Sequence, residues 1–376
     1  MRSVHLRRSR AALLVGLCVG LAALVAGSTS RPDAADAAGP SLQRPFARAI
    51  DAPGAILRRV RLQARAALTW HCGPTLTSTG ETVRILVSDT YAVGTPACET
   101  WAEFLVKLAH GPEISRLTTY IAPLDEVETV CGARALGCYS ADEMISMGEV
   151  FPDGTTPEEV VRHEYGHHIA MNRLNPPWKA IEWGPKYWAS TMQVCARAKR
   201  SEVFPGDEGA QYELNPGEGW AETYRVMEER RAGILTAAWH TVSQLFYPTT
   251  ASLQAAEKDV LQPWTKGRQE VFRRQFTRKG KKVWLVRLST PLDGSLVVNA
   301  VVPKAAAYEV ALLAPNRRTV LERAVVAGPK TRRISAEICG QRSLFLRVTE
   351  QSAVSKNVAL AKNGAFGRVS VTVATP

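Results

Sequence analysis

Residues 156–172 read Thr-Pro-Glu-Glu-Val-Val-Arg-His-Glu-Tyr-Gly-His-His-Ile-Ala-Met-Asn, and this run is the clearest helix signal in the chain. Thr156 suits the N-cap, a proline follows at the first helical position, and Glu159 completes a capping box. Residues four apart lie on one face of a helix, so the imidazoles of His163 and His167 can reach one metal ion. The run therefore predicts a helix that carries part of a metal site.

Glu164 occupies the position that supplies a general base in His-Glu-x-x-His patterns. A catalytic zinc ion needs three protein ligands and one open position for water. In one known arrangement the third ligand is a histidine six residues after the second, but Arg173 stands there in this chain. The other common third ligand is a glutamate on a later helix.

Residues 215–224, Asn-Pro-Gly-Glu-Gly-Trp-Ala-Glu-Thr-Tyr, predict such a helix, with asparagine as its N-cap and proline in its first turn. Glu218 and Glu222 are four residues apart and share one helix face. Metal-bound histidines usually donate their second N–H to a carboxylate or a carbonyl. We therefore assign Glu218 as the third ligand and Glu222 as the acceptor for His163 or His167. The alternative is a solvated helix face with two ordinary glutamates.

Together, His163–His167 and the Asn-Pro-x-Glu-x-Trp-Ala-Glu run resemble the gluzincin branch of the zincin metallopeptidases. The glutamate helix is most similar to that of the anthrax lethal factor-like peptidases. The resemblance extends at most over residues 82–231. It implies a mixed sheet above the metal helix, with an edge strand that pairs with extended peptide, and Tyr139–Met147 is the candidate for that strand.

The activity that the resemblance implies is hydrolysis of peptide bonds at a zinc ion held by the two histidines and Glu218. In that mechanism Glu164 takes a proton from zinc-bound water and passes it to the leaving amine. Tyr212 is the preferred donor to the oxyanion, and Tyr224 is the alternative. Two other hypotheses are a zinc-binding module without catalysis and a secreted scaffold with a coincidental motif. The retained Glu164 favours an enzyme.

Residues 1–38 resemble a secretory signal, because a basic start precedes an apolar run and small residues follow. That apolar run is short for a membrane span, and no other stretch of the sequence is long enough to compete. Residues 39–70 are rich in Arg, Ala and Pro, which predicts a linker, a short pro-segment or an arm. The net charge of the 376 residues is +12, and we attribute it mainly to these two segments. No nucleic-acid recognition motif accompanies the charge. We expect a secreted monomer that acts on peptides or proteins, not nucleic acid.

Cys18 lies in the predicted leader, which leaves six cysteines. An even number in an exported chain favours disulfides, although the sequence does not choose among the pairings. Cys131–Cys138 closes the shortest loop and is the first expectation. Cys72–Cys98 is the second, which leaves Cys195–Cys339 to connect the two halves of the chain.

The predicted fold class is α+β, with a zincin-like domain over residues 71–265. Before the helix that carries the histidines, we expect strands over Thr82–Ser88, Arg116–Ala122 and Tyr139–Met147. A helix is expected over Ala97–His110 and a loop over residues 123–138. A helical, tryptophan-rich subdomain follows.

An all-β sandwich is predicted over residues 266–376, because short β-rich runs alternate there with Gly, Pro and Asn. The runs are Lys282–Leu288, Ser295–Val302, Tyr308–Ala314, Thr319–Val326, Ser343–Thr349 and Arg368–Val373.

Overall fold

The structure is a computed structural model that describes residues 48–49, 69–92, 97–235, 237–239, 242–303, 306–328, 331–351 and 366–376. The predicted leader and most of the predicted linker lie outside these ranges. The described chain combines helices with several sheets, which confirms the α+β class. Within it, no helix is both long and apolar enough to cross a membrane.

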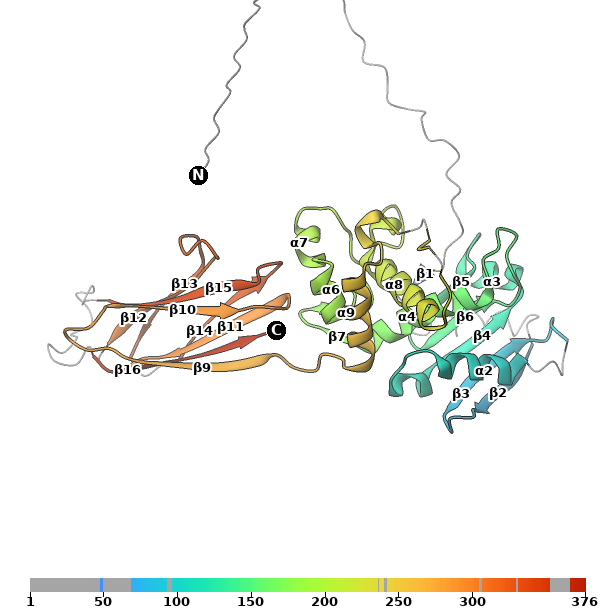
Figure 1. The fold of residues 1–376 in the computed structure, drawn as a ribbon, viewed down its shortest axis with the longest axis horizontal. Helices are drawn as coiled ribbons and strands as arrows, with labels where there is room; N and C mark the ends of the chain where they lie inside the picture. Colours follow the sequence, from blue (N-terminus) through green and yellow to red (C-terminus); the bar gives the residue numbers. More distant parts are fainter. Residues whose placement is uncertain are drawn as a thin grey trace, which may run out of the picture. The chain divides into compact units, whose positions relative to one another are not determined.

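A six-stranded mixed sheet, ordered β1-β5-β6-β4-β3-β2, forms the first part of the fold (Figure 1). The strands are β1 (Arg48–Ala49), β2 (Trp70–Leu76), β3 (Thr82–Ser88), β4 (Thr118–Ala122), β5 (Gly137–Ser140) and β6 (Glu143–Met147). Helix α2 (Ala97–Lys107) packs against β2 and β3, and a 3-10 turn, η1 (Pro112–Arg116), precedes β4. The strand predicted over Thr82–Ser88 is confirmed.

The run Tyr139–Met147 belongs to a hairpin, so the prediction of one edge strand there is wrong. Ala141 and Asp142 both have positive φ, at 40° and 70°, as the two central residues of a type I′ turn require. Strand β6 consequently lies inside the sheet between β5 and β4, and the short β1 pairs in parallel with β5. The turn lacks glycine and asparagine, so its sequence carries no usual hairpin signal.

The loop predicted over residues 123–138 is wrong in its first half, where α3 (Leu124–Cys131) forms. Asp125 and Glu126 lie in its first turn, where acidic residues complement the helix dipole. Val127 and Val130 are buried on one face. The helix is short, which is why periodicity alone did not indicate it.

The helix predicted to carry the two histidines and the helix predicted to carry Glu218 both form. Helix α4 (Pro157–Met171) begins at the expected capping box, and α8 (Pro216–Arg231) begins at Asn215, whose side chain accepts the Gly217 N–H. The other elements of this region are β7 (Leu174–Asn175), β8 (Trp178–Lys179), α5 (Ala180–Trp183), α6 (Lys186–Thr191), α7 (Val194–Lys199), η2 (Tyr212–Leu214), η3 (Gln244–Phe246) and α9 (Thr250–Leu261).

Helices α4 and α8 approach each other closely at Gly166. A Cβ at this position would lie 2.9 Å from Ala221 Cα, and the Gly166 carbonyl accepts a 2.7 Å hydrogen bond from Trp220 Nε1. Helix α4 also packs against β5 and β6. The sheet and α8 therefore enclose the face of α4 that carries the histidines.

The C-terminal part contains two antiparallel four-stranded sheets, ordered β10-β15-β12-β13 and β14-β11-β16-β9. The strands are β9 (Arg268–Gln275), β10 (Val283–Ser289), β11 (Gly294–Val301), β12 (Ala307–Leu313), β13 (Val320–Ala327), β14 (Arg332–Ile338), β15 (Ser343–Glu350) and β16 (Arg368–Thr375). One apolar core holds side chains from both sheets, including Val298 and Val310, so the sheets form a sandwich.

Two strands of the sandwich, β9 and β14, are absent from the sequence prediction. Their sequences, Arg-Gln-Glu-Val-Phe-Arg-Arg-Gln and Arg-Arg-Ile-Ser-Ala-Glu-Ile, carry few apolar residues. Arginine at exposed positions weakens the β-rich signal on which the prediction relied. The six predicted runs all form strands, with ends that differ by no more than about two residues from those expected.

All three expected disulfides are present. Cys72–Cys98 connects β2 to α2, and Cys131–Cys138 connects the end of α3 to β5. Cys195–Cys339 connects α7 to the residue after β14.

We predict that Gly166→Ala lowers the free energy of unfolding by roughly 2–3 kcal/mol, because the added Cβ meets the α8 backbone. This cost exceeds the gain of about 1 kcal/mol that alanine has over glycine in a helix. Gly209→Ala is the control, because its Cβ would meet only Asp207 Oδ1, at 3.4 Å. Urea denaturation of both variants measures the difference, and equal midpoints would contradict the close approach of α4 and α8.

Candidate metal centre

Three side chains converge between α4 and α8. One donor atom each from His163, His167 and Glu218 lies within 4.8 Å of the others. His163 Nε2 is 3.1 Å from Glu218 Oε2, and His167 Nε2 is 3.5 Å from Glu218 Oε1. None of the three residues is more than 1% exposed. The grouping expected from the sequence is confirmed.

This group fits a divalent metal ion. Both ring nitrogens of His167 and Oε1 of Glu218 are buried without a hydrogen-bond partner among the described residues. Buried polar atoms are costly unless they are satisfied, and a metal ion would satisfy these. Two imidazoles and a carboxylate form a donor set that zinc takes in catalytic sites.

The charges within the group also favour a cation. Burial opposes ionisation of Glu218, but His167 and His163 outweigh burial and lower the pKa of Glu218. Burial likewise opposes protonation of His163, but the bonds to Glu218 and Glu222 raise its pKa to about 10. A metal ion that binds here competes with that proton, so binding releases protons.

Glu222 lies one helical turn after Glu218, and its Oε2 is 3.5 Å from His163 Nδ1. Arg225 donates to its two oxygens at 2.6 and 2.9 Å, and the Trp239 N–H donates to Oε1 at 2.6 Å. Burial alone would raise the pKa of Glu222, but Arg225 and His163 lower it. Glu222 is therefore an anion beside the His163 ring, close to the position expected for it from the sequence, but His163 Nδ1 has no hydrogen-bond partner among the described residues.

Glu164 is fully buried, and neither of its carboxylate oxygens has a hydrogen-bond partner among the described residues. Burial raises the pKa of Glu164 well above its usual range, and Glu218 adds to this effect while His163 opposes it. A carboxylate with a raised pKa is a stronger proton acceptor than one in water. The arrangement suits a general base.

The two candidate tyrosines differ in position. Tyr212 lies in η2 directly before α8 and donates its hydroxyl to Glu218 Oε2 at 2.6 Å. Burial and the nearby Glu218 raise the pKa of Tyr212, so its hydroxyl stays protonated. Tyr224 instead donates to the Ala109 carbonyl at 2.7 Å. Of the two, Tyr212 is the one that contacts the metal group.

Three residues near the group were not identified from the sequence. The Tyr139 ring is stacked with His167, with 6.4 Å between ring centroids, and the Trp239 ring is stacked with His163 at 5.3 Å. Arg225 follows Glu222 by three residues, a spacing that favours an ion pair on a helix and could have indicated it. The two aromatic contacts join distant segments and have no comparable local signal.

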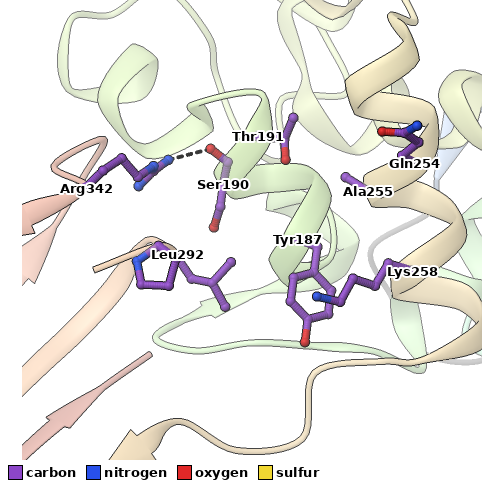
Figure 2. Close-up of a pocket in the computed structure, with 9 residues that line it drawn as sticks. Tyr187, Ser190, Thr191, Gln254, Ala255, Lys258, Leu292 and Arg342 are labelled. Carbon is purple, nitrogen blue, oxygen red and sulfur yellow. Dashed lines mark hydrogen bonds between the residues drawn. The ribbon is translucent and has the colours of Figure 1, made fainter. Parts of the chain in front are cut away.

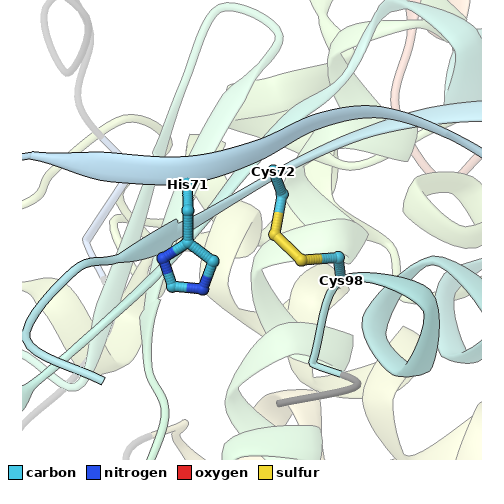
Figure 3. Close-up of side chains that lie close together, drawn as sticks. All are labelled: His71, Cys72 and Cys98. Atoms are coloured by element: carbon cyan, nitrogen blue, oxygen red, sulfur yellow. A yellow bond between two sulfur atoms is a disulfide. The ribbon is translucent and has the colours of Figure 1, made fainter. Parts of the chain in front are cut away.

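Two other groups of potential ligands do not suit a metal. His71 lies beside Cys72 and Cys98, but Figure 3 shows these two cysteines joined as a disulfide. Cys195 and Cys339, which lie near a glutamate, are also joined. Cysteine binds metal ions as a thiolate, and the sulfur atoms of a disulfide are not thiolates.

A pocket of about 310 Å³ lies elsewhere, between α6, α9 and the turn before β11 (Figure 2). Lys258 and Tyr187 lie on one side of it and Arg342 on the other. The Arg342 guanidinium donates a 2.6 Å hydrogen bond to the Ser190 carbonyl. No residue of the metal group lines this pocket.

No protein-family model and no curated protein matches this chain. Among solved structures, similarity is found to a mitogen from Yersinia pseudotuberculosis, at 10% identity, covering 29% of this chain and 87% of that one, with a TM-score of 0.21. The K3 cleaved adhesin domain of Lys-gingipain from Porphyromonas gingivalis is similar at 14% identity, covering 27% of this chain and 71% of that one, with a TM-score of 0.19. At these TM-scores the similarities support no conclusion.

We predict that the purified protein holds about one metal ion per chain and that His163→Ala and Glu218→Ala each abolish this binding. His168→Gln is the control, since His168 is adjacent in sequence but bonds the Glu113 carbonyl at 2.9 Å. Metal content is measured by mass spectrometry after gel filtration. Unchanged content in either alanine variant would exclude that residue as a ligand.

Proposed function

We propose that this chain is a secreted zinc-dependent peptidase of the gluzincin type, with a zincin-like domain before the sandwich. The observation that carries the proposal is the Glu164 carboxylate, buried and without a described hydrogen-bond partner beside a His-His-Glu donor set. The sequence resemblance of both helices to gluzincins supports the same class.

The side chains take distinct roles in this proposal. His163, His167 and Glu218 hold the ion, and Glu222 orients His163. A zinc ion held there would act as a Lewis acid and would lower the pKa of water toward neutrality. Glu164 accepts the proton of the attacking water and delivers it to the leaving amine.

The margin of the sheet beside β5 supports an extended peptide as substrate. Tyr139 of β5 is stacked with His167, so this strand lies next to the metal group. Strand β1 pairs with Cys138 and Tyr139 and so occupies this margin, and a substrate peptide would add beside β1 or take its place. Peptides commonly bind by adding a strand to such an edge.

An extracellular location fits the three disulfides, because disulfides persist in oxidising compartments. A second candidate function is a zinc-binding module that acts without catalysis. The buried Glu164 is the observation that favours the enzyme, since an unpaired buried carboxylate destabilises a purely structural site.

We predict that Glu164→Gln lowers kcat for a peptide-library substrate by about 10²–10⁴-fold, because glutamine cannot accept the proton. Metal content should stay unchanged. Glu158→Gln, an exposed position in the first turn of α4, is the control and should keep its activity. Near wild-type cleavage by Glu164→Gln would remove Glu164 from the mechanism, and a metal-loaded wild-type protein without cleavage would favour the binding module.

We further predict that Tyr212→Phe lowers kcat by about 10²–10³-fold with little change in metal content, as expected for the loss of an oxyanion donor. Tyr224→Phe is the control, because it also removes a tyrosine hydroxyl, but one that bonds the Ala109 carbonyl. Its kcat should stay within about threefold of the wild-type value. Steady-state kinetics on one fluorogenic peptide compare the two. Loss of metal in Tyr212→Phe would instead assign the hydroxyl to holding Glu218.

A further inference from the structure

The formal charge is divided unevenly between the two halves of the chain. Residues 71–265 contain 15 Lys and Arg against 26 Asp and Glu, a charge of −11. Residues 266–376 contain 21 Lys and Arg against 6 Asp and Glu, a charge of +15. The first 70 residues contain 11 against 3. The expectation that the positive excess belongs mainly to the first 70 residues is therefore wrong.

Strand pairing gathers many of these cations at one end of the sandwich. In the sheet β14-β11-β16-β9, Arg332 pairs with Ala300, and the next residue of β11, Val301, pairs with Ser370. Arg368, two residues before Ser370, pairs with the last residue of β9. The turn that follows β9 at this end leads into β10 and reads Thr-Arg-Lys-Gly-Lys-Lys.

We call this surface the basic end and define it by six exposed residues: Arg278, Lys279, Lys281, Arg332, Arg333 and Arg368. The neighbouring Lys282 pairs with Glu350 at 2.8 Å, but the six have no ion pair among the described residues. Like charges gathered without counterions repel one another, and a polyanion removes that repulsion.

The opposite end of the sandwich is bonded to residues that precede the sandwich in the chain. It contains Cys339, which is bonded to Cys195, and Asp293, whose carbonyl accepts a 2.8 Å hydrogen bond from Lys186 Nζ. The basic end has none of these contacts among the described residues, and its side chains are open to solvent.

The types of side chain exposed at the basic end indicate which class of polyanion it binds. The described part of this end exposes no aromatic side chain and no leucine: its exposed apolar side chains include Val283 and Val301, and the Phe366 ring is contacted by Lys282 at 4.2 Å. Single-stranded nucleic acids bind on aromatic stacking platforms, and interfacial membrane binding uses bulky apolar anchors. A chain of carboxylated sugars needs neither, because each carboxylate can pair with a separate Lys or Arg.

We propose that the basic end of the sandwich binds an acidic polysaccharide, a polymer with uronate-type carboxylates, and thereby retains the protein at an anionic surface. The negative charge of residues 71–265 disfavours contact of that half with the same polymer, which leaves the metal centre free for its own substrate. This inference does not depend on the proposed peptidase activity.

The test measures binding of the full chain to immobilised polygalacturonate at several salt concentrations. Lys279→Gln, Lys281→Gln, Arg332→Gln and Arg333→Gln are combined in one variant. The control combines Lys107→Gln, Arg230→Gln, Lys266→Gln and Arg318→Gln, four exposed cations outside the basic end. We expect affinity to fall steeply with salt in the wild type. It should be at least about tenfold weaker in the first variant and within about twofold of wild type in the control.

Several results would overturn the proposal. Absence of wild-type binding, or equal losses in both variants, would show that the basic end is not a binding surface. Tighter binding to duplex DNA or to phosphatidylglycerol vesicles than to polygalacturonate would assign the surface to a different partner. Thermal unfolding of both variants verifies that they are folded, and metal content verifies that the centre is intact.

Discussion

The close approach of α4 and α8 is the constraint on which the candidate metal centre depends. Two of the candidate ligands lie on one helix and the third on the other, so they meet only if the helix backbones nearly touch. Gly166 permits this approach because it has no Cβ to meet Ala221, and the Trp220 side chain bonds the Gly166 carbonyl across the contact. The N-caps fix where each helix starts and therefore the position of each candidate ligand along its helix axis.

Buried charges next to this contact need partners of their own. Arg225 is fully buried and bridges Glu222 to Glu229, with its guanidinium nitrogens 2.6–2.9 Å from their oxygens. Arg173, which occupies the position of a third histidine in some zincins, pairs with Glu113 at 3.0 Å. Removing one member of a buried ion pair typically costs about 3–5 kcal/mol. Arg225 therefore orients the Glu222 carboxylate beside His163, and the separate Arg173–Glu113 pair joins the chain just after α4 to η1.

The sandwich depends on its apolar core. Its core is apolar and continuous between the two sheets, so the exposed positions of its strands are free to carry charge. Arginines at those positions conceal β9 and β14 in the sequence, and the two in β14, Arg332 and Arg333, also belong to the basic end. The arginines of β14 thus explain both why this strand was not predicted and part of a candidate binding surface.

The local sequence by itself determined the two helices of the candidate metal centre, their caps and the faces that carry His163, His167, Glu218 and Glu222. Caps and helical periodicity depend on residues a few positions apart, so a single sequence contains them. It also predicted six of the sandwich strands, and the expected disulfide pairs came from loop length, because the sequence does not choose among the pairings. Only the tertiary structure decided that Tyr212 rather than Tyr224 contacts Glu218, and that Trp239 and Arg225 surround the centre. It also revealed the β5–β6 hairpin and the basic end. These features depend on distances between segments that are far apart in the chain, and local periodicity does not encode such distances.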